Sequence, residues 1–400
     1  MKRFKPFAKP VSPAPVSHAA AGDLLRVFCV FMIAWYHIWQ QSWLSPRLRL
    51  GSLVIDVTPW VGAGYMFVDL MLLLSGFLLY LPWANDRPPE TRAFFRRRAG
   101  RILPSYWLCL LVMLIFAVAD SDFSDAGRLA KDLLAHLTFT HNLFPFSYTF
   151  TRLNVALWTL AVEVQFYLLL PALAPAFRRR PILCWALMTG AALSFRTLWT
   201  VQMADTTLFV NRLPNMLDLY ASGMLAAHIY AALARRKDHR ALIAALGTLL
   251  CVLGAWGVLR LVRAQAMLYG DYEAIRHGQL ERRWLLGVCG AAFLLGGSLS
   301  FAPLRRTLSN RAVRFLSALS YNFYIWHQWT AVRLKVLHIP PYLSAEPNQA
   351  GEMPWQLHFT LLCFAAALAL AALLTWCVEK PAARWFGRRG KMSEELGMRN

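Results

Sequence analysis

The sequence predicts an all-α membrane protein, a polytopic bundle of about ten transmembrane helices. Of its 400 residues, 58% are hydrophobic and only 16% are charged, against about 25% charged residues in a typical soluble protein. Apolar runs close to 20 residues long recur along the chain, which is the length that a helix needs to cross a bilayer. Basic residues gather between these runs. The composition therefore excludes a soluble protein with a single membrane anchor.

The apolar runs define ten expected spanning helices. The fifth and sixth are the least regular, because Arg196, Arg212 and Asp218 lie close to their ends. We expect one transmembrane domain over residues 23–380, a flexible tail over 1–22, and a second tail over 381–400 that is too short to fold alone. The expected helices are residues 24–43, 61–83, 102–119, 154–177, 181–201, 214–234, 241–262, 284–303, 315–336 and 356–378.

The basic residues predict the orientation in the membrane. If the N-terminus is cytoplasmic, the cytoplasmic segments hold 27 of the 42 Lys and Arg residues, as the positive-inside rule requires. The acidic residues Asp120, Asp122 and Asp125 then lie together on the outside. Both termini are therefore predicted to be cytoplasmic. The net charge of +21 is explained by this topology and by contact with anionic lipids, and without a nucleic-acid-binding motif it does not indicate nucleic acid.

The seven cysteines predict neither disulfides nor a metal site. All of them lie inside apolar runs, and no CxxC or Cys/His spacing is present. Cysteine in such surroundings behaves as a small buried apolar residue. We expect no tightly bound cofactor and no metal.

The first apolar run carries two polar residues that share one face. Arg26 and His37 are eleven positions apart, so at 100° per residue they differ by only about 20° and lie about 16 Å apart along the helix axis. An ionisable side chain costs about 3 kcal/mol to place in lipid, so it usually faces protein or a water-filled cavity and has a function.

Three further ionisable residues are expected at the depth of His37, in the outer half of the membrane. They are Asp69, Glu163 and His327, each on a different helix. Two imidazoles and two carboxylates suit a catalytic base held by acids. The alternative is that these residues form structural hydrogen bonds between helices. On the helix of His327, a polar stripe consists of Ser317, Ser320, Tyr324 and His327.

The cytoplasmic side carries a different chemistry. Arg98 and Arg101 precede the third helix and point the same way if that helix begins early. Clustered guanidiniums bind phosphates well, although an anchor at the lipid headgroups explains them equally. Ser75 and Gly76 lie deep in the second helix, and Gly76 shares the face of Asp69 and permits close approach of a ligand or another helix.

Six blocks of the sequence together resemble the acyltransferase-3 family of membrane acyltransferases. The first is Arg26 and His37, which match the family's Arg-x10-His spacing. The resemblance runs from Arg26 to Pro381 and is strong because the blocks occur in the family's order. The other five are MFVDLMLLLSGFLL, Arg98-Ala-Gly-Arg101 followed by ILPSYW, LWTLAVEVQFYLLLP, LSYNFYIWHQW and VEKPAARW.

The resemblance implies that an acyl group, often acetyl, passes from cytoplasmic acyl-CoA to a hydroxyl group, commonly of a sugar at the outer face. It makes Arg26, His37, Arg98 and Arg101 the leading functional positions, with acyl-CoA bound on the arginines near Ser75 and Gly76. His37 would act as general base or carry the acyl group itself, and Asp69 or Glu163 would orient it. The protein would then be a multi-pass protein of a bacterial inner membrane, acting on a carbohydrate or lipid-linked glycan.

The acceptor and the alternatives are less well defined. We assign Tyr324, His141 and Asn142 to the acceptor, although His141 and Asn142 are equally explained as loop residues at the membrane interface. Intramembrane His, Asp and Glu also suit a proton-coupled transporter or a flippase for lipid-linked sugars. Against this second function, no inverted repeat is visible. A non-catalytic scaffold leaves the aligned polar residues unexplained.

Overall fold

The computed structural model describes residues 19–119, 126–203, 205–236, 238–268 and 271–387. Ten helices of 18 residues or more in this part of the chain coincide with the ten predicted helices, so the predicted fold class is confirmed. The residues Asp120, Asp122 and Asp125 and most of both predicted tails lie outside the described residues. The ten helices are α1 (Ala20–Ser42), α3 (Phe67–Ala84), α4 (Thr91–Ala119), α6 (Trp158–Arg179), α7 (Pro181–Gln202), α8 (Leu217–Ala234), α9 (Arg240–Ala266), α10 (Tyr272–Leu299), α12 (Arg311–Val336) and α13 (Met353–Leu374).

Shorter helical elements connect the long helices. The three short α-helices are α2 (Thr58–Gly62), α5 (Ala126–Leu137) and α11 (Ala302–Leu308). Four 3₁₀ turns precede or follow longer helices, and the last turn of α13 continues as a π-helix. These elements are η1 (Gly64–Met66), η2 (His141–Leu143), η3 (Val155–Leu157), η4 (Leu213–Met216) and the π-helix η5 (Thr375–Glu379).

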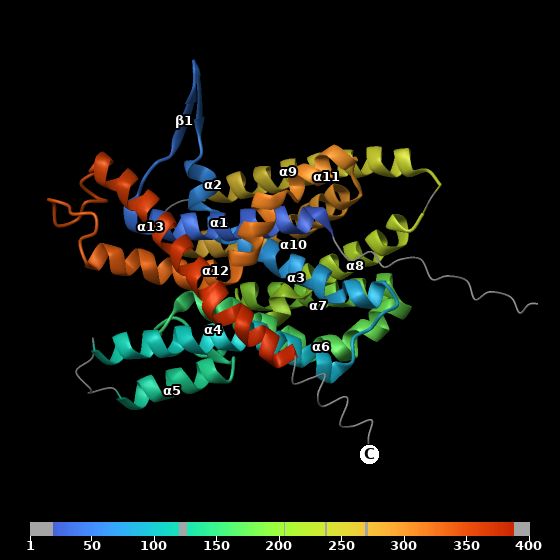
Figure 1. Cartoon of the computed structure of the whole chain (residues 1–400), viewed down its shortest axis with the longest axis horizontal. Helices are drawn as coiled ribbons and strands as arrows, with labels where there is room; N and C mark the ends of the chain where they lie inside the picture. Colours follow the sequence, from blue (N-terminus) through green and yellow to red (C-terminus); the bar gives the residue numbers. More distant parts are fainter. Residues whose placement is uncertain (1–18, 120–125, 204, 237, 269–270, 388–400) are drawn as a thin grey trace, which may run out of the picture.

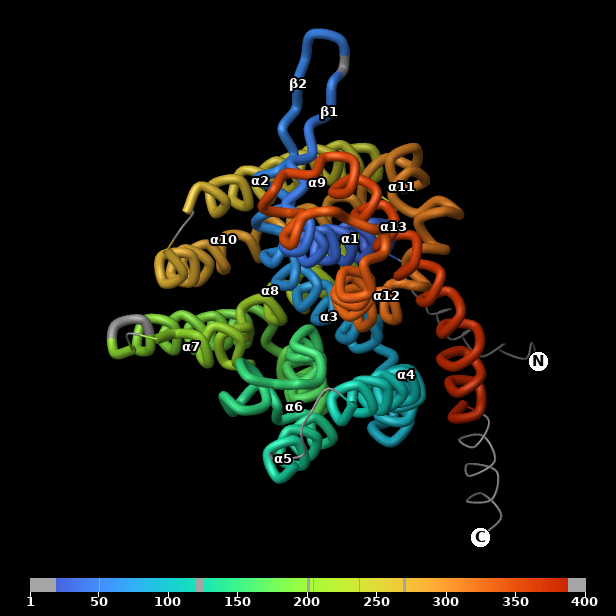
Figure 2. The backbone as a smooth tube through the Cα atoms, turned by 90° about the vertical axis from the view of Figure 1, so that its left-hand side faces the viewer, coloured from blue at the N-terminus to red at the C-terminus, as the bar shows by residue number. Residues whose placement is uncertain are grey.

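Helix α1 lies in the middle of the bundle. Figure 2 shows it nearly end-on, with the other helices of the bundle around it, and it contacts α3, α10, α12 and α13. Helices α3 and α8 pack on each other and link this group to α6 and α7. The helix that carries Arg26 and His37 is therefore packed mainly against other helices.

A β-hairpin that the sequence analysis did not predict follows α1. Strands β1 (Arg47–Leu50) and β2 (Leu53–Asp56) pair antiparallel, with Leu50 opposite Leu53. The turn includes Gly51, whose φ of +63° suits glycine. The hairpin projects from the helices in Figures 1 and 2. The alternation in RLRLGSLVID with a central glycine is the sequence signal for it.

Eight helices among the described residues are long and apolar enough to cross a membrane, and α10 with α11 forms a ninth candidate bent by 119°. Helix α12 is too polar for this criterion, yet its 26 residues would extend about 39 Å. The polar side chains in its middle, such as Ser317, Ser320 and Asn322, are buried where α12 packs on α1, α13 and α4, which explains how a polar helix fits among apolar ones. The protein is thus a multi-pass membrane protein, while the orientation of its termini stays a prediction.

Helices α10 and α4 begin more than ten residues earlier than predicted, and the second of these shifts matters for the site. Helix α10 begins at Tyr272 instead of residue 284, because Asp271 caps it by accepting hydrogen bonds from the amides of Glu273 and Ala274. Helix α4 begins at Thr91 instead of residue 102. The segment with Arg98 and Arg101 is therefore helical, and the two residues lie one turn apart on the same side.

Candidate active site

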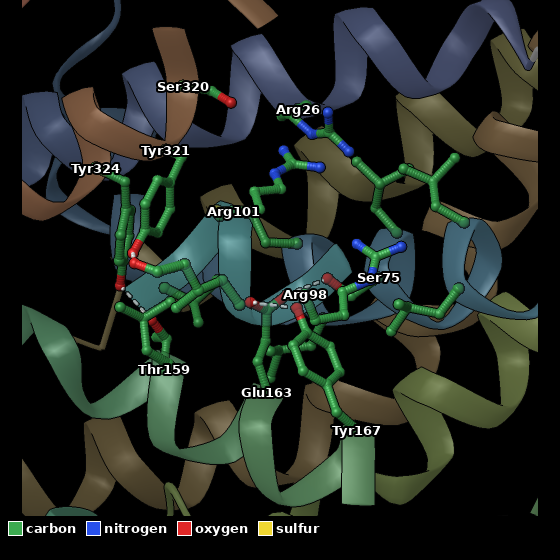
Figure 3. A pocket seen from close by; sticks show the side chains of 18 residues that line it. Arg26, Ser75, Arg98, Arg101, Thr159, Glu163, Tyr167, Ser320, Tyr321 and Tyr324 are labelled. Carbon is green, nitrogen blue, oxygen red and sulfur yellow. Dashed lines mark hydrogen bonds between the residues drawn. The ribbon is translucent and has the colours of Figure 1, made fainter. Parts of the chain in front are cut away.

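A cavity of about 160 Å³ lies between α1, α3, α4, α6 and α12, and we call it the arginine cavity. Figure 3 shows Arg26 reaching it from α1, Arg98 and Arg101 from α4, and Glu163 from α6. Its polar lining residues are Arg26, Ser75, Arg98, Arg101, Thr159, Glu163, Tyr167, Ser320, Tyr321 and Tyr324. The predicted cluster of arginines thus forms, together with Ser75 and Tyr324.

The arginine cavity is strongly positive. Three arginines and a single carboxylate, Glu163, line it. The Nε atom of Arg98 is buried and has no hydrogen-bond partner among the described residues. The guanidinium group of Arg98 lies 5.8 Å from the ring centroid of Phe94 and 5.9 Å from that of Tyr167. Aromatic rings orient a guanidinium without neutralising it, so this side chain remains available to an anion such as a phosphate.

Glu163 faces the arginine cavity and not His37. It accepts a hydrogen bond from the hydroxyl of Ser75 and one from the hydroxyl of Tyr167 at 3.2 Å. One side chain of α3 and one of its own helix, α6, therefore fix its carboxylate beside the arginines (Figure 3). The predicted contact between Glu163 and His37 does not form, although both residues lie at similar positions along their helices.

His37 lies against His327, as their predicted common depth suggested. Their ring centroids are 5.2 Å apart with a tilt of 38°. His327 is 1% exposed, whereas His37 is half-buried. The two imidazoles join α1 to α12, the pair of helices that packs along the centre of the bundle. We call them the histidine pair.

Hydrogen bonds set the tautomer of both rings. Nδ1 of His327 lies 2.5 Å from the carbonyl oxygen of Tyr324, so Nδ1 carries the hydrogen and donates it. Nδ1 of His37 lies 3.0 Å from the amide oxygen of Gln40, which can only accept. In both rings the Nε2 lone pair is then free to take a proton, which is the state a general base requires.

Tyr324 connects the arginine cavity to the histidine pair. It lines the cavity, and its ring centroid is 5.7 Å from that of His327. Its hydroxyl donates to the carbonyl of Ala156 at 3.0 Å and accepts from Thr159 at 2.9 Å. Tyr324 is therefore a fixed wall between the two sites. Its hydroxyl is engaged within the protein, and its predicted contact with the acceptor stays a prediction.

A protein-family model described as an acyltransferase domain matches residues 20–376, which include every residue of the arginine cavity and the histidine pair. The chain belongs to the acyltransferase-3 family. The resemblance found in the sequence motifs is thereby confirmed over most of the chain.

Three relatives of this chain illustrate the family. Peptidoglycan O-acetyltransferase OatA of Listeria monocytogenes is 24% identical over 67% of this chain and 45% of its own length. O-acetyltransferase OatA of Staphylococcus aureus is 26% identical over 42% of this chain and 26% of its own. Nodulation protein 10 of Rhizobium leguminosarum is 28% identical over 39% of this chain and 44% of its own. The chain thus spans less than half the length of these relatives. No solved structure matches it.

Within the helix bundle, Asp69 pairs with Arg283 and does not lie beside His37 as predicted. Its Oδ2 atom lies 3.0 Å from Nε of Arg283, and both side chains are 0% exposed. Arg283 also donates to the carbonyl of Val210 at 2.8 Å. Because a buried charge without a partner is costly, this pair explains Asp69 without catalysis. Gln40 takes the place beside His37 that we assigned to a carboxylate.

Gly76 packs closely against helix α8, and its predicted role in binding the donor stays a prediction. A Cβ atom at this position would lie 2.5 Å from the backbone oxygen of Tyr220 on α8. On the facing helix, a Cβ atom at Gly223 would lie 2.0 Å from the backbone oxygen of Leu73. The two glycines allow α3 and α8 to approach closely, which was the alternative that the sequence left open.

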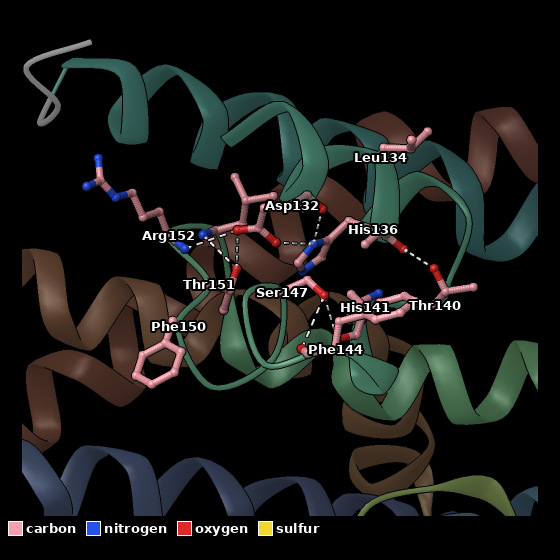
Figure 4. Close-up of polar contacts among 12 residues, drawn as sticks. Asp132, Leu134, His136, Thr140, His141, Phe144, Ser147, Phe150, Thr151 and Arg152 are labelled. Atoms are coloured by element: carbon pink, nitrogen blue, oxygen red, sulfur yellow. Dashed lines mark hydrogen bonds and ion pairs between the residues drawn. The ribbon is translucent and has the colours of Figure 1, made fainter. Parts of the chain in front are cut away.

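His141 and Asn142 are buried in the loop that follows α5, each about 1% exposed. The ring of His141 stacks on that of His136 at 4.0 Å between centroids (Figure 4). Asn142 accepts a hydrogen bond from Gln165 at 2.9 Å and donates to the carbonyl of Asn211 at 3.3 Å. These residues hold the loop onto α6, so the structure does not expose them to an acceptor.

Helix α5, just before this loop, contains a buried acid-histidine pair. Nδ1 of His136 lies 3.0 Å from Oδ1 of Asp132, whose second oxygen accepts from the hydroxyl of Thr151 at 2.8 Å and from the amide of Arg152 at 3.2 Å (Figure 4). Burial and the neighbouring His136 lower the pKa of His141 to about 3. His141 is therefore neutral at physiological pH.

The sequence analysis missed two residues that the site depends on. Gln40 is a neutral amide, and a search for carboxylates near His37 passes over it. Arg283 lay just outside the predicted helix at 284–303. Had the capping signal at Asp271 been used to extend that helix, Arg283 would have appeared as an intramembrane cation that needs a carboxylate.

Proposed function

We propose that this protein is a membrane O-acyltransferase that moves an acyl group, most simply acetyl, from acyl-CoA to a hydroxyl group of a carbohydrate. The observation that carries the proposal is the position of the histidine pair directly beyond a cavity with three converging arginines. The names of the OatA relatives support acetyl as the group and a glycan such as peptidoglycan as the acceptor.

The donor would bind at the arginine cavity. Arg26, Arg98 and Arg101 offer forked donors that suit phosphate oxygens, and CoA carries phosphates. A volume of about 160 Å³ accommodates only part of such a molecule, because pockets that enclose whole small ligands measure about 300–1,000 Å³. The phosphates would therefore remain near the open end, and the thioester arm would extend along α1 toward Tyr324 and the histidine pair.

The transfer step would use His37 as the general base. Its Nε2 atom takes the proton from the acceptor hydroxyl, and the oxygen attacks the thioester carbonyl carbon. The carbon–sulfur bond breaks, and CoA leaves as a thiolate that receives the proton back. The same geometry allows His37 to carry the acyl group transiently as an acyl-imidazole. Acid quenching followed by mass spectrometry of the intact protein distinguishes the two routes by the acyl mass on His37.

The direction of transfer follows from the predicted orientation. With both termini cytoplasmic, Arg26 lies toward the cytoplasm, where acyl-CoA is made, and the far end of α1 lies at the outer face. The protein would then act in the inner membrane of a bacterium on a carbohydrate or lipid-linked glycan. No step in this scheme needs a metal ion or a bound cofactor.

The test combines cells and purified protein. Mass spectrometry of envelope glycans from cells with and without the gene should show an acyl mass that disappears on deletion and returns with the wild-type gene. Purified protein in nanodiscs should bind acetyl-CoA specifically and release CoA when it is supplied with that glycan. Absence of acetyl-CoA binding together with unchanged glycans would refute the enzyme and leave the transporter as the better explanation.

A further inference from the structure

We infer that a second cavity at the opposite end of α1 binds the acceptor as a neutral carbohydrate; this inference rests on the proposed function. The cavity has a volume of about 660 Å³ and lies between α1, α2, η1 and the ends of α9 and α10 that face each other. We call it the aromatic cavity. The residues that carry the argument are Tyr36, Trp39, Gln40, Trp43, Asp56 and Tyr65.

The rings of the aromatic cavity form a connected wall. Tyr36 stacks near Trp39, with 6.4 Å between centroids and a tilt of 25°, and meets Tyr65 edge-on at 5.3 Å. The C–H bonds on one face of a sugar ring carry partial positive charge, and the face of an aromatic ring is negative. A wall of rings therefore suits the flat face of a sugar, whereas a charged ligand gains little from it.

The polar groups of the aromatic cavity suit hydroxyls and not phosphates. Gln40, Asp56 and Thr58 line it, and no lysine or arginine is among its described lining residues. Hydrogen bonds from Thr58 lower the pKa of Asp56, so its carboxylate is ionised and accepts hydrogen bonds. This charge repels phosphates. The arginine cavity and the aromatic cavity thus select for opposite ligand types.

The wall of the aromatic cavity is already fixed by the protein. Gln265 donates to the hydroxyl of Tyr65 at 2.8 Å and to the carbonyl of Ile275 at 2.7 Å. Trp60 ties α2 to α9 by donating to the carbonyl of Leu259 at 3.0 Å. A prearranged wall reduces the entropy lost on binding. Aromatic residues that only mark the lipid interface do not need to be held in this way.

Gln40 joins the aromatic cavity to the histidine pair. It is an exposed lining residue, its amide oxygen is the partner of His37, and its amide nitrogen donates to the hydroxyl of Tyr36 at 3.0 Å. The rings of Tyr36 and His37 are 5.1 Å apart. A hydroxyl that reaches the Gln40 end of the cavity therefore meets the base. On this geometry the acyl donor and the acceptor approach the histidine pair from opposite sides.

The experiment measures each substrate separately with full-length protein in nanodiscs. The probes are acetyl-CoA and envelope glycan isolated from the deletion strain. Trp39→Ala should raise the KM for the glycan by about tenfold, the loss expected for one stacked ring, and acetyl-CoA binding should persist. Trp39→Phe should restore most of the glycan affinity. Trp107→Ala, a half-exposed tryptophan on α4 outside both cavities, is the matched control and should change neither value.

Two outcomes overturn the inference while leaving the proposed function intact. Either the Trp39→Ala and Trp39→Phe proteins transfer acetyl with the wild-type KM for glycan, or Trp107→Ala raises that KM as much as Trp39→Ala does, as a general aromatic belt predicts. Failure of the proposed function looks different, because wild-type protein would then neither bind acetyl-CoA nor transfer from it. Retained acetyl-CoA binding shows in each case that the variant is folded.

Discussion

The arginine cavity and the aromatic cavity share one helix and little else. The first collects three guanidiniums and one carboxylate within about 160 Å³, whereas the second is about 660 Å³ and combines rings with neutral amide, hydroxyl and carboxylate groups. Arg26 and Trp43, one from each cavity, are 17 residues apart on or next to α1, or about 25 Å along the axis. A single rigid helix therefore carries both sites.

The difference teaches how this protein would keep its two substrates apart. Charge separates the two ligands, since a phosphate is favoured by the arginines and disfavoured by Asp56, whereas a neutral carbohydrate gains no charge attraction from the arginines. The histidine pair lies between them, joined to the arginine cavity through Tyr324 and to the aromatic cavity through Gln40. Both substrates can then reach one base without sharing a binding site.

The largest effect is expected where the two cavities meet. His37→Ala removes the base and should lower acetyl transfer by about 10³-fold, while acetyl-CoA binding persists because the arginines remain. The measurement is the release of CoA from purified protein with glycan present. His358→Ala, an exposed histidine of α13, is the control. If His37→Ala transfers acetyl at the wild-type rate, His37 is not the base, and the histidine pair does not link the two cavities.

The second prediction concerns Asp69, which belongs to neither cavity. Asp69→Asn leaves Arg283 buried without its counter-charge and should destabilise the fold by about 3–5 kcal/mol. Melting in detergent should therefore occur at a lower temperature. Replacing both residues together, as Asp69→Leu with Arg283→Met, should recover much of the loss. If Asp69→Asn melts at the wild-type temperature but transfers acetyl poorly, Asp69 takes part in catalysis.

These residues show what the sequence could and could not predict. The ten helices were predictable because each is an apolar run of spanning length, and Arg26, Arg98 and Arg101 converge as their motifs suggested. Depth along a helix follows from counting residues at about 1.5 Å each. The rotation of one helix against another does not follow, because it depends on packing such as that of Gly76 on α8.

The errors follow from the same limit. Asp69 and Glu163 were placed at the depth of His37, but their helices turn them toward Arg283 and toward the arginine cavity. Tertiary partners decide which of several polar residues at one depth meet. The aromatic cavity was not predictable either, since Tyr36 and Trp39 look like ordinary apolar residues until α2 and η1 pack beside them.

The third prediction separates the cavities by their donors. Arg98→Ala should raise the KM for acetyl-CoA by about 30-fold and leave the KM for glycan unchanged, because the loss of a forked, charge-assisted contact is worth about 2 kcal/mol. Arg98→Lys keeps the charge but not the fork and should recover only part of the affinity. Arg97→Ala is the matched control, since this neighbour is exposed and does not line the cavity. If Arg97→Ala and Arg98→Ala raise the KM for acetyl-CoA equally, the cluster of arginines serves only as an anchor at the lipid headgroups.

The smallest effect is expected in the loop after α5, to which the sequence assigned the acceptor before the aromatic cavity was known. Burial lowers the pKa of His141 to about 3, well below its ordinary value of about 6.5. The unfolded chain therefore binds the extra proton first, so the stability that neutral His141 contributes is complete above pH 6.5 and is lost as the pH falls toward 3. At pH 5.5 the loss should be about 1.4 kcal/mol.

His141→Phe tests this assignment, because phenylalanine keeps a ring to stack on His136 but cannot be protonated. The difference in melting temperature between pH 7.5 and pH 5.5 should be smaller for this variant than for the wild type. The KM for glycan at pH 7.5 should not change, since His141 is buried and the aromatic cavity lies elsewhere. If that KM rises severalfold while the melting behaviour at both pH values is unaltered, the loop contacts the acceptor, and the contrast between the two cavities has to include a third site.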